Sequence, residues 1–326
     1  MAESPPKGAL YGGQAIIEGV MIRGASDAVV AVRKPNGAIM VQPLPQSKLW
    51  LSRWRHILFL RGIAVLAETL TLGMKALAVS ANAALPPEDE SKDAELPEEQ
   101  TLGGMALGGM IALSLTLAIV IFFIIPLFLS RGLESFGWNY WAANAGEGGI
   151  RILLFLAYIW LIGRMSDIQR LYGYHGAEHM AVHAHENGDP LTPEGLRLHP
   201  TAHSRCGTAF LLTVVFVSIV AFMFFPRDPL WIHFASRIVL IPVVAAVSYE
   251  IIRFNGRHSH WWWVQVVAWP SLLLQNLTTK QPDDGQCEVA IASIQAAIAL
   301  DNGESVFTGT PVPLVPENTC GASTAE

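Results

Sequence analysis

Charged side chains are scarce in this chain. Only 15% of its 326 residues are Asp, Glu, Lys or Arg, whereas a soluble globular domain carries about 25%. Hydrophobic residues make up 52% of the chain, and the mean hydropathy is +0.38. This balance excludes an ordinary pair of soluble domains and indicates a membrane protein with polar appendages.

Cysteines and clustered basic residues are also rare. The spacings of Cys206, Cys287 and Cys320 indicate neither a disulfide framework nor a Cys-x-x-Cys site. The net charge is −6 and no basic stripe with interleaved aromatic residues occurs, so nucleic acid is not an expected partner. Residues 1–10 lack a basic segment followed by an apolar one, so no cleaved signal peptide is expected.

Long uncharged runs predict a mainly α, polytopic helical membrane protein with about four transmembrane helices. Residues 101–130 and 206–226 contain no charged side chain. Residues 148–166 and 236–254 reach the length of a span only if the arginines near their ends extend to the membrane surface. These arginines are Arg151, Arg164, Arg237 and Arg253.

The N-terminal region, residues 1–55, predicts a small β unit on the cytoplasmic side. Two β-prone runs, 28–33 and 38–42, flank a Pro-Asn-Gly sequence that is typical of a hairpin turn. Residues 11–24 are rich in glycine. These glycines serve either tight turns or a functional site, and the sequence leaves both interpretations open.

The other segments are predicted from composition. Residues 56–84 carry charges at seven-residue spacing on an apolar helix, which indicates an amphipathic or membrane-packed helix. Seven acidic residues and three prolines in residues 85–100 predict a disordered linker. The rest divides into a helical membrane domain at 101–281, with a His-rich loop at 164–206, and a C-terminal cytoplasmic helix with a disordered tail at 282–326.

Two features predict the placement in the membrane. Residues 261–279 contain four tryptophans and Pro270, which favours an interfacial or re-entrant segment, with a fifth span as the alternative. Ten Lys and Arg residues precede the first span, whereas the loops 131–151 and 227–237 hold two each. The N-terminus, the His-rich loop and the C-terminus are therefore expected in the cytoplasm, in a multi-pass protein of the inner membrane.

A histidine-rich segment carries the clearest functional signal. His175, Glu178 and His179 form an H-x-x-E-H motif. Because positions i and i+4 of a helix share a face, two imidazoles can bind one divalent ion such as Zn²⁺, and the intervening glutamate is a candidate general base, as in inverzincins. The helix is expected to begin after Gly173 and to end near Gly188. The alternative is a polar, solvated helix whose histidines have no role.

A catalytic zinc ion needs a third protein ligand and an open position. The sequence offers His203, Cys206 and Glu250 as candidates. Cys206 is equally explained as an inert buried thiol. Glu250 is either functional, since a carboxylate within a span is costly, or part of an ion pair with Arg253 or Arg257.

His183 forms a rival i, i+4 pair with His179, but that pair has no glutamate in the base position. His183 also lies about 12 Å along the helix from the first motif histidine, too far for both to bind the same ion. Further candidates are polar residues in or near these motifs, namely Glu18, Arg23, Glu186 and Arg205.

Five ordered motifs carry a family resemblance. They are Gly-Gly-Gln-Ala-Ile-Ile-Glu-Gly-Val-Met-Ile-Arg-Gly at 12–24, Tyr-His-Gly-Ala-Glu-His at 174–179, Arg-Cys-Gly-Thr at 205–208, Ser-Tyr-Glu at 248–250 and Leu-Thr-Thr-Lys-Gln-Pro-Asp-Asp at 277–284. On these motifs the chain resembles domain of unknown function 1385 over roughly residues 11–300. Bacterial members are often labelled predicted metal-dependent enzymes, so the resemblance implies a metal site without implying a substrate.

We therefore expect a metal-dependent hydrolase at the cytoplasmic membrane face, acting on a membrane-protein segment, a peptide or a lipid. A non-enzymatic factor for membrane-protein insertion or assembly, with a structural metal or polar site, is the alternative. A divalent-metal transporter ranks last, because Glu250 is the one carboxylate expected within a span. The expected partners are the lipid bilayer and other membrane proteins.

Overall fold

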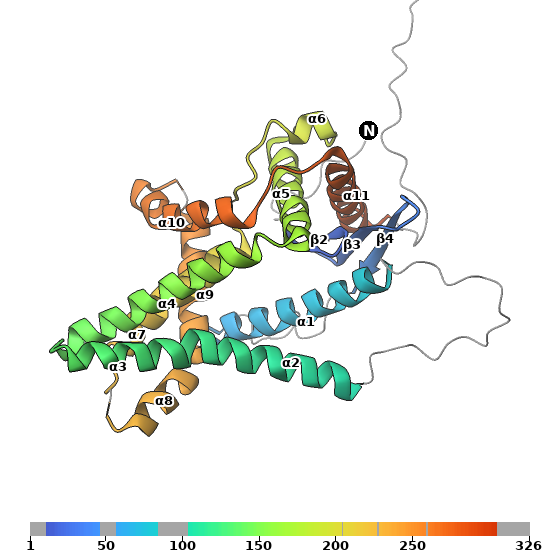
Figure 1. Ribbon diagram of the computed structural model, residues 1–326. Helices are drawn as coiled ribbons and strands as arrows, with labels where there is room; N and C mark the ends of the chain where they lie inside the picture. Colours follow the sequence, from blue (N-terminus) through green and yellow to red (C-terminus); the bar gives the residue numbers. More distant parts are fainter. Residues whose placement is uncertain are drawn as a thin grey trace, which may run out of the picture.

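The computed structural model describes residues 11–45, 57–83, 104–203, 205–226, 228–258 and 260–304. Figure 1 shows a small sheet covered by helices at one end of the molecule and a group of long helices at the other. The mainly α architecture with an N-terminal β unit is confirmed. The predicted linker at 85–100 and the tail beyond residue 304 lie outside the described residues.

The β unit is a four-stranded antiparallel sheet with the order β1-β2-β3-β4. Its strands are β1 (Gly12–Ile16), β2 (Gly19–Arg23), β3 (Ala28–Arg33) and β4 (Ile39–Leu44). The predicted hairpin is confirmed as β3–β4, and Gly37 in its turn has a φ of 84°, which favours glycine. The glycine-rich stretch forms a second hairpin, β1–β2, with Glu18 in its turn at a φ of 53°.

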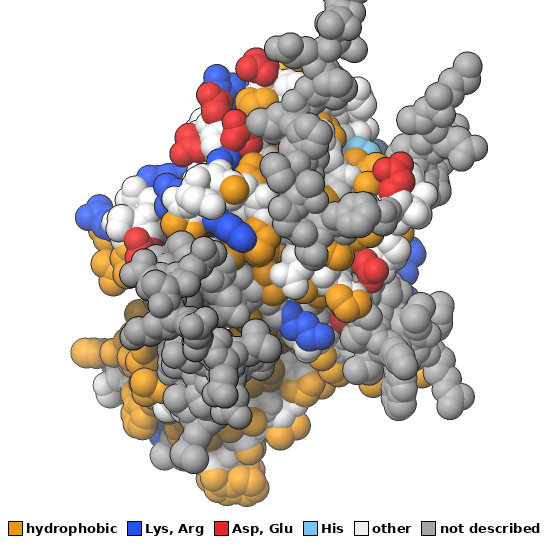
Figure 2. Space-filling model, turned by 90° about the vertical axis from the view of Figure 1, so that its right-hand side faces the viewer, with side chains coloured by type: hydrophobic (Ala, Val, Ile, Leu, Met, Phe, Trp, Pro, Cys, Tyr) orange, Lys and Arg blue, Asp and Glu red, His pale blue; other side chains and the backbone are white. Residues whose placement is uncertain are grey.

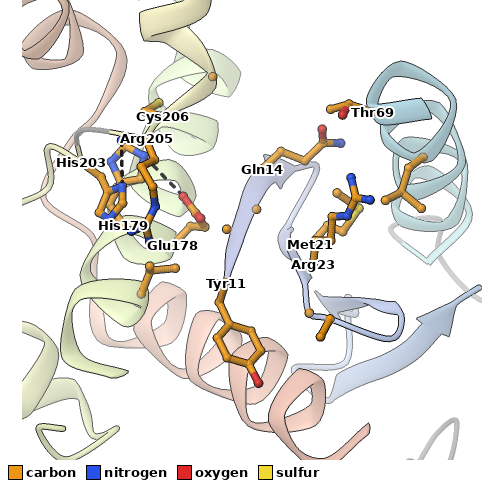
Figure 3. Close-up of a pocket in the computed structure, with 17 residues that line it drawn as sticks. Tyr11, Gln14, Met21, Arg23, Thr69, Glu178, His179, His203, Arg205 and Cys206 are labelled. Atoms are coloured by element: carbon orange, nitrogen blue, oxygen red, sulfur yellow. Dashed lines mark hydrogen bonds and ion pairs between the residues drawn. The ribbon is translucent and has the colours of Figure 1, made fainter. Parts of the chain in front are cut away.

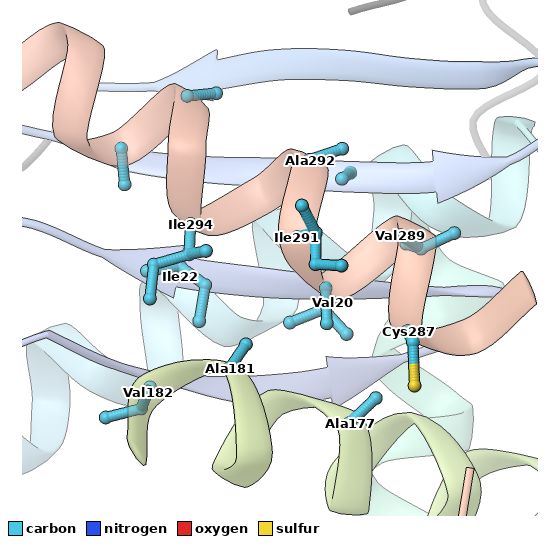
Figure 4. Packing of buried hydrophobic residues seen from close by; sticks show 14 of the residues in the cluster. Val20, Ile22, Ala177, Ala181, Val182, Cys287, Val289, Ile291, Ala292 and Ile294 are labelled. Atoms are coloured by element: carbon cyan, nitrogen blue, oxygen red, sulfur yellow. The ribbon is translucent and has the colours of Figure 1, made fainter. Parts of the chain in front are cut away.

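Both faces of the sheet are covered, because alternate side chains of a strand point to opposite faces. Val20, Ile22, Val29 and Ala31 pack in one core with α5 (Ser166–Asn187) and α11 (Asp284–Asp301). Figure 4 shows α11 lying across the strands, with α5 beside it. The residues between them in sequence, such as Met21 and Val30, pack with Leu72 and Ala76 of α1 (Leu60–Ala83) on the other face. The sheet and α1 at the N-terminal end of the chain therefore form one packed unit with α5 and α11, which are far away in sequence.

Helix α5 begins at Ser166, so the predicted start after Gly173 is wrong. Glycine is a weak helix former, but Gly173 lies inside the helix for a packing reason. A Cβ at this position would lie 2.3 Å from Oε1 of Gln286 in α11, so glycine permits the two helices to approach. The predicted end is confirmed, because Gly188 adopts the left-handed conformation and its N–H caps the helix at Ala184.

The apolar part of the molecule contains most of the remaining helices. In addition to α1 they are α2 (Gly104–Ile119), the π-helical η3 (Val120–Ile124), α3 (Ile125–Ser135), α4 (Tyr140–Ile162), α7 (Gly207–Phe222), α8 (Leu230–Val239), α9 (Ile241–Arg257) and α10 (Trp262–Thr278). Figure 2 shows charged side chains mostly over the upper part of one face and hydrophobic side chains over its lower part. Several apolar helices could thus contact a bilayer.

By length and composition, three helices of the described chain could cross a membrane, or four if the α8–α9 pair is one bent span. The three are α1, the run Ala112–Leu133 and α4. Helix α7 has 16 residues, fewer than the roughly 20 of a typical span. The predicted single helix at 236–254 is divided between α8 and α9, which meet at 41°. Proline at position 242, in the first turn of α9, lacks the N–H that would continue a single helix.

Two arginines that were expected to reach the membrane surface are buried instead. Arg151 of α4 and Arg237 of α8 are 4% and 3% exposed, and both contact Glu147, at 3.1 and 3.3 Å. Nε of Arg151 also donates to the carbonyl of Phe122 in η3, at 2.9 Å. A buried charge is stable only when it is paired, so this network explains the burial. Glu147 is thus a second carboxylate in a candidate span, one residue before the predicted range.

Candidate metal centre

Helix α5 brings the two motif histidines together on one face. The ring centroids of His175 and His179 are 4.4 Å apart. Nδ1 of His175 lies 2.8 Å from the carbonyl of Thr278, and Nδ1 of His179 lies 2.5 Å from the carbonyl of Thr201. Because a carbonyl only accepts, each Nδ1 carries the proton. Each Nε2 therefore has a lone pair for a metal, in the arrangement that is usual for metal-binding histidines.

Cys206 offers a third candidate ligand atom. Its sulfur lies 3.2 Å from Nε2 of His175 and accepts the N–H of Thr208 as the N-cap of α7. Among the described residues, the His175, His179 and Cys206 ligand atoms form a group in which all lie within 4.8 Å of one another. Ligand atoms around a tetrahedral zinc ion are roughly 3.3–3.7 Å apart, so small side-chain movements would suffice. Without an ion, the thiol can donate to the same imidazole nitrogen.

Glu178 lies at the edge of this cluster. Its side chain is buried, and Oε2 lies 3.4 Å from Nε2 of His179. The backbone N–H of Gly13 in β1 also bonds to this carboxylate. Burial raises the pKa of the Glu178 carboxyl above its ordinary value, although the nearby imidazoles, this N–H and Arg205 oppose the rise. The position suits a general base or a fourth ligand.

A second group of polar residues holds the loop that leads to Cys206. Nε2 of His183 donates to the carbonyl of Ala202 at 3.0 Å, which gives this histidine a structural partner. His203 accepts the N–H of Arg205 at Nδ1, and its Nε2 lies 3.7 Å from Glu186. Both nitrogens of His203 thus face partners other than the candidate ligand atoms of His175, His179 and Cys206.

Glu186 also forms an ion pair with Arg205. Burial raises the pKa of Glu186, but hydrogen bonds from His203 and Arg205 outweigh this effect and lower its pKa to about 2. Gln275 of α10 bonds to both the N–H and the carbonyl of His203, at 2.7 and 3.0 Å. These contacts connect α5, the loop and α10.

The other candidates from the sequence lie apart from the cluster. Glu250 pairs with Arg61 of α1, with Oε1 at 2.6 Å from Nε, rather than with the two arginines on its own helix. Glu18 in the β1–β2 turn binds Arg170 and accepts from the hydroxyl of Tyr174 at 3.2 Å. The ion pair of Glu250 links α9 to α1, and the contacts of Glu18 link the sheet to α5.

A cavity of about 610 Å³ lies beside the cluster, between β1, α1, α5 and the start of α7. Figure 3 shows its labelled residues on two sides, with Glu178, His179, His203, Arg205 and Cys206 facing Gln14, Met21, Arg23 and Thr69. Gly12 and Gly13 contribute exposed backbone to the wall. A Cβ at Gly13 would lie 2.0 Å from the carbonyl oxygen of Met21, so this position requires glycine.

The sequence did not identify several groups that complete the site. The carbonyls of Thr201 and Thr278 and the N–H of Gly13 are backbone atoms, so no side-chain pattern marks them. Gln275 is a polar residue within an apolar helix, and this is the one signal that could have indicated its role. The glycine-rich stretch serves both the β1–β2 hairpin and the cavity wall.

Comparisons with known proteins agree with the resemblance seen in the sequence. The profile of the family described as "Protein of unknown function (DUF1385)" matches residues 57–300. The "Uncharacterized protein YqhQ" of Bacillus subtilis (strain 168) is 34% identical over 295 residues, which cover 89% of this chain and 93% of that protein. No solved structure matches the chain.

Proposed function

Because the chain belongs to the DUF1385 family, whose description assigns no activity, we propose its function from the geometry of the site: a metal-dependent hydrolase at the membrane surface. The observation that supports this proposal is the convergence of three ligand atoms beside a cavity of about 610 Å³. The ligands would be His175, His179 and Cys206. Of the three candidates for the third ligand, Cys206 is the one that the geometry favours.

The donor set fits a zinc-like divalent ion. Two imidazole nitrogens and one sulfur are ligands that Zn²⁺ prefers, and three protein ligands leave a fourth position for water or substrate. When bound, such an ion supplies Lewis-acid activation of water and of a substrate carbonyl or phosphoryl oxygen.

Different residues of the chain would transfer the proton, orient the ligands and line the cavity. Glu178 would take the proton from the attacking water, and the N–H of Gly13 fixes its carboxylate in place. Thr201 and Thr278 hold the two imidazoles in the tautomer that suits metal binding. Arg23 and Arg205 line the cavity as paired cations, with Glu68 at 3.4 Å and with Glu186, so they would offer N–H donors to a substrate oxygen rather than net positive charge.

The substrate class follows from where the cavity lies. Cys206 is the N-cap of the apolar helix α7, so the site lies at the junction of the sheet unit and the apolar helices. A membrane-protein segment, a peptide or a lipid could reach it from the bilayer. We assign the protein to the inner membrane, with the site and both termini in the cytoplasm, from the distribution of Lys and Arg. Other membrane proteins are the second class of partner.

A structural site is the second candidate, and one observation favours it. The cluster joins α5 to the N-terminus of α7 and to the end of α10 at Thr278. Glu178 is also close enough to His179 to act as a fourth ligand, which would close the site. The protein would then be an insertion or assembly factor in which the ion holds the sheet unit against the membrane helices.

The substitution Glu178→Gln separates these functions. The amide is nearly isosteric but takes no proton, so a hydrolase should retain the ion and lose turnover. We expect Glu178→Gln to fail to complement a deletion strain although its expression and metal content equal those of the wild type. His175→Ala serves as the metal-free comparison. Complementation by Glu178→Gln together with failure of His175→Ala would contradict the hydrolase and favour the structural site.

A further inference from the structure

A second cavity, of about 510 Å³, lies between the start of α1, the end of α9 and the start of α10. Its charged lining consists of three guanidinium groups and one carboxylate, from Arg61, Arg253, Arg257 and Glu250. Arg61 is neutralised by its bidentate pair with Glu250. The cavity therefore has two positive charges in excess, and its chemistry is unrelated to that of the metal cluster.

Arg253 and Arg257 carry this excess charge. They are four residues apart in α9, so they lie on the same face, one turn from each other. Among the described residues neither guanidinium forms a hydrogen bond to a carboxylate. Two adjacent guanidinium groups of this kind match the oxygens of a phosphate, which guanidinium groups bind in a bidentate manner.

Aromatic rings form part of the remaining lining of the cavity, together with aliphatic side chains and Asn255. The ring of Phe254 stacks on His258 with centroids 4.3 Å apart, and on Trp263 at 5.9 Å. Nδ1 of His258 lies 2.9 Å from the carbonyl of Phe254 and donates to it, so Nε2 remains as an acceptor. The lining next to the two arginines is thus largely apolar.

The adjoining surface of α10 is suited to the membrane interface. Trp262 is 76% exposed and Trp269 is 60% exposed, with Val266 between them at 63%. Tryptophans prefer the level of the lipid headgroups, and exposed aliphatic side chains favour the acyl region next to it. A molecule in the cavity would thus have its charged part at the arginines and an apolar part along α10.

We propose that this cavity binds the phosphate headgroup of an anionic membrane phospholipid. Basic pockets between membrane helices on the cytoplasmic side are suited to such headgroups. Arg253 and Arg257 bind the phosphate oxygens, and Trp262, Val266 and Trp269 contact the acyl chains. The lipid thereby connects α9 to α10, the helix whose Gln275 holds the loop of the metal cluster.

The test measures lipid binding by the purified full-length protein. Nanodiscs of phosphatidylcholine, with and without phosphatidylglycerol, are prepared with the wild type and with Arg253→Gln/Arg257→Gln, and the bound lipid is quantified by native mass spectrometry. We expect the wild type to retain phosphatidylglycerol and the double variant to bind it about thirtyfold more weakly. Arg253→Lys/Arg257→Lys keeps the charge but loses the bidentate contacts, so its affinity should lie between those of the wild type and the Gln variant.

Arg164→Gln is the matched control, because Arg164 also lies at the end of a candidate span but stacks on Trp160 at 3.7 Å, outside the cavity. Equal retention of phosphatidylglycerol by the double variant and the wild type would overturn the proposal. So would a wild type that does not prefer phosphatidylglycerol to phosphatidylcholine, a result that needs no variant to fold. Displacement of the lipid by inorganic phosphate alone would assign the cavity to a free anion and also overturn it. The metal content of the double variant should be unchanged, so this test is independent of the hydrolase.

Discussion

At the scale of single residues, the histidines of α5 differ in which ring nitrogen contacts the backbone. His175 and His179 contact carbonyls through Nδ1, which leaves Nε2 of each facing the candidate metal centre, whereas His183 uses Nε2 for the carbonyl of Ala202. Three histidines at successive i+4 positions thus have two different roles. The carbonyls outside α5 that each histidine contacts, at Thr278, Thr201 and Ala202, determine which ring nitrogen stays available.

Glu186 gives a prediction about acid stability. Its pKa of about 2 in the folded protein lies below the ordinary value of 4.5, so its contribution to stability is present above pH 4.5 and is lost as the pH falls towards 2. Glu186→Gln removes this titration. Thermal unfolding of both proteins in detergent between these pH values should show the stability difference between wild type and variant shrinking as the pH falls. A constant difference would contradict the assigned partners, His203 and Arg205.

At the scale of elements, glycines allow α5 to pack closely against the chain that follows α10. A Cβ at Gly176 would lie 2.2 Å from the carbonyl oxygen of Lys280, which is backbone and cannot rotate away. Lys280 in turn donates its N–H to the carbonyl of Tyr172, at 2.9 Å. This contact fixes the segment next to Thr278, whose carbonyl orients His175.

Gly176→Ala should therefore destabilise the protein, by roughly 1–3 kcal/mol, as overpacking of a tight interface does. Gly149→Ala is the matched control. This glycine also lies in a helix, but no atom lies within 4 Å of the position of an added Cβ. The control should be neutral or slightly stabilising, because alanine favours the helix. Thermal unfolding in the same detergent measures both, and equal melting temperatures would contradict the close approach.

How much of this could be predicted from the sequence depends on whether the feature is local. The β3–β4 hairpin, the end of α5 at Gly188 and the shared face of His175 and His179 follow from spacing over a few residues. The choice of Cys206 over His203 and Glu250 required the approach of α7 to α5. Glu250 pairs with Arg61, 189 residues away, so the partners expected on its own helix were wrong. Gly173 was interpreted as a helix boundary because nothing in the sequence indicates that α11 packs against it.

At the scale of the whole molecule, one shared core constrains the path through the membrane. The sheet, α5 and α11 pack together, so they lie on the same side of a bilayer. If the candidate spans cross that bilayer, their number must be even between β4 and α5, and again between α5 and α11. Since α1 packs Leu72 against the sheet, the first two crossings are assigned to α2–α3 and α4. If this part of the chain crosses at all, two of α7, the α8–α9 pair and α10 cross and one does not.

From the distribution of Lys and Arg and the exposed tryptophans we propose that α7 and the α8–α9 pair cross and that α10 lies at the surface. A reporter inserted at Gly137, between α3 and α4, should be found outside the cytoplasm. Reporters inserted after Gly188 and after His258 should both be found in the cytoplasm. A reporter after His258 that lies on the same side as the one at Gly137 would show that α10 crosses and that the α8–α9 pair is re-entrant.

The central claim is that His175, His179 and Cys206 bind one divalent ion. The most direct test is the metal content per chain of the purified protein, measured by elemental analysis, for the wild type, His175→Ala/His179→Ala, Cys206→Ser and His183→Ala. We expect about one zinc-like ion per wild-type chain, none in the double variant and a large loss in Cys206→Ser. His183→Ala should keep the ion, because its Nε2 binds the carbonyl of Ala202 instead. Wild-type protein without metal, or equal metal content in all four proteins, would contradict the claim.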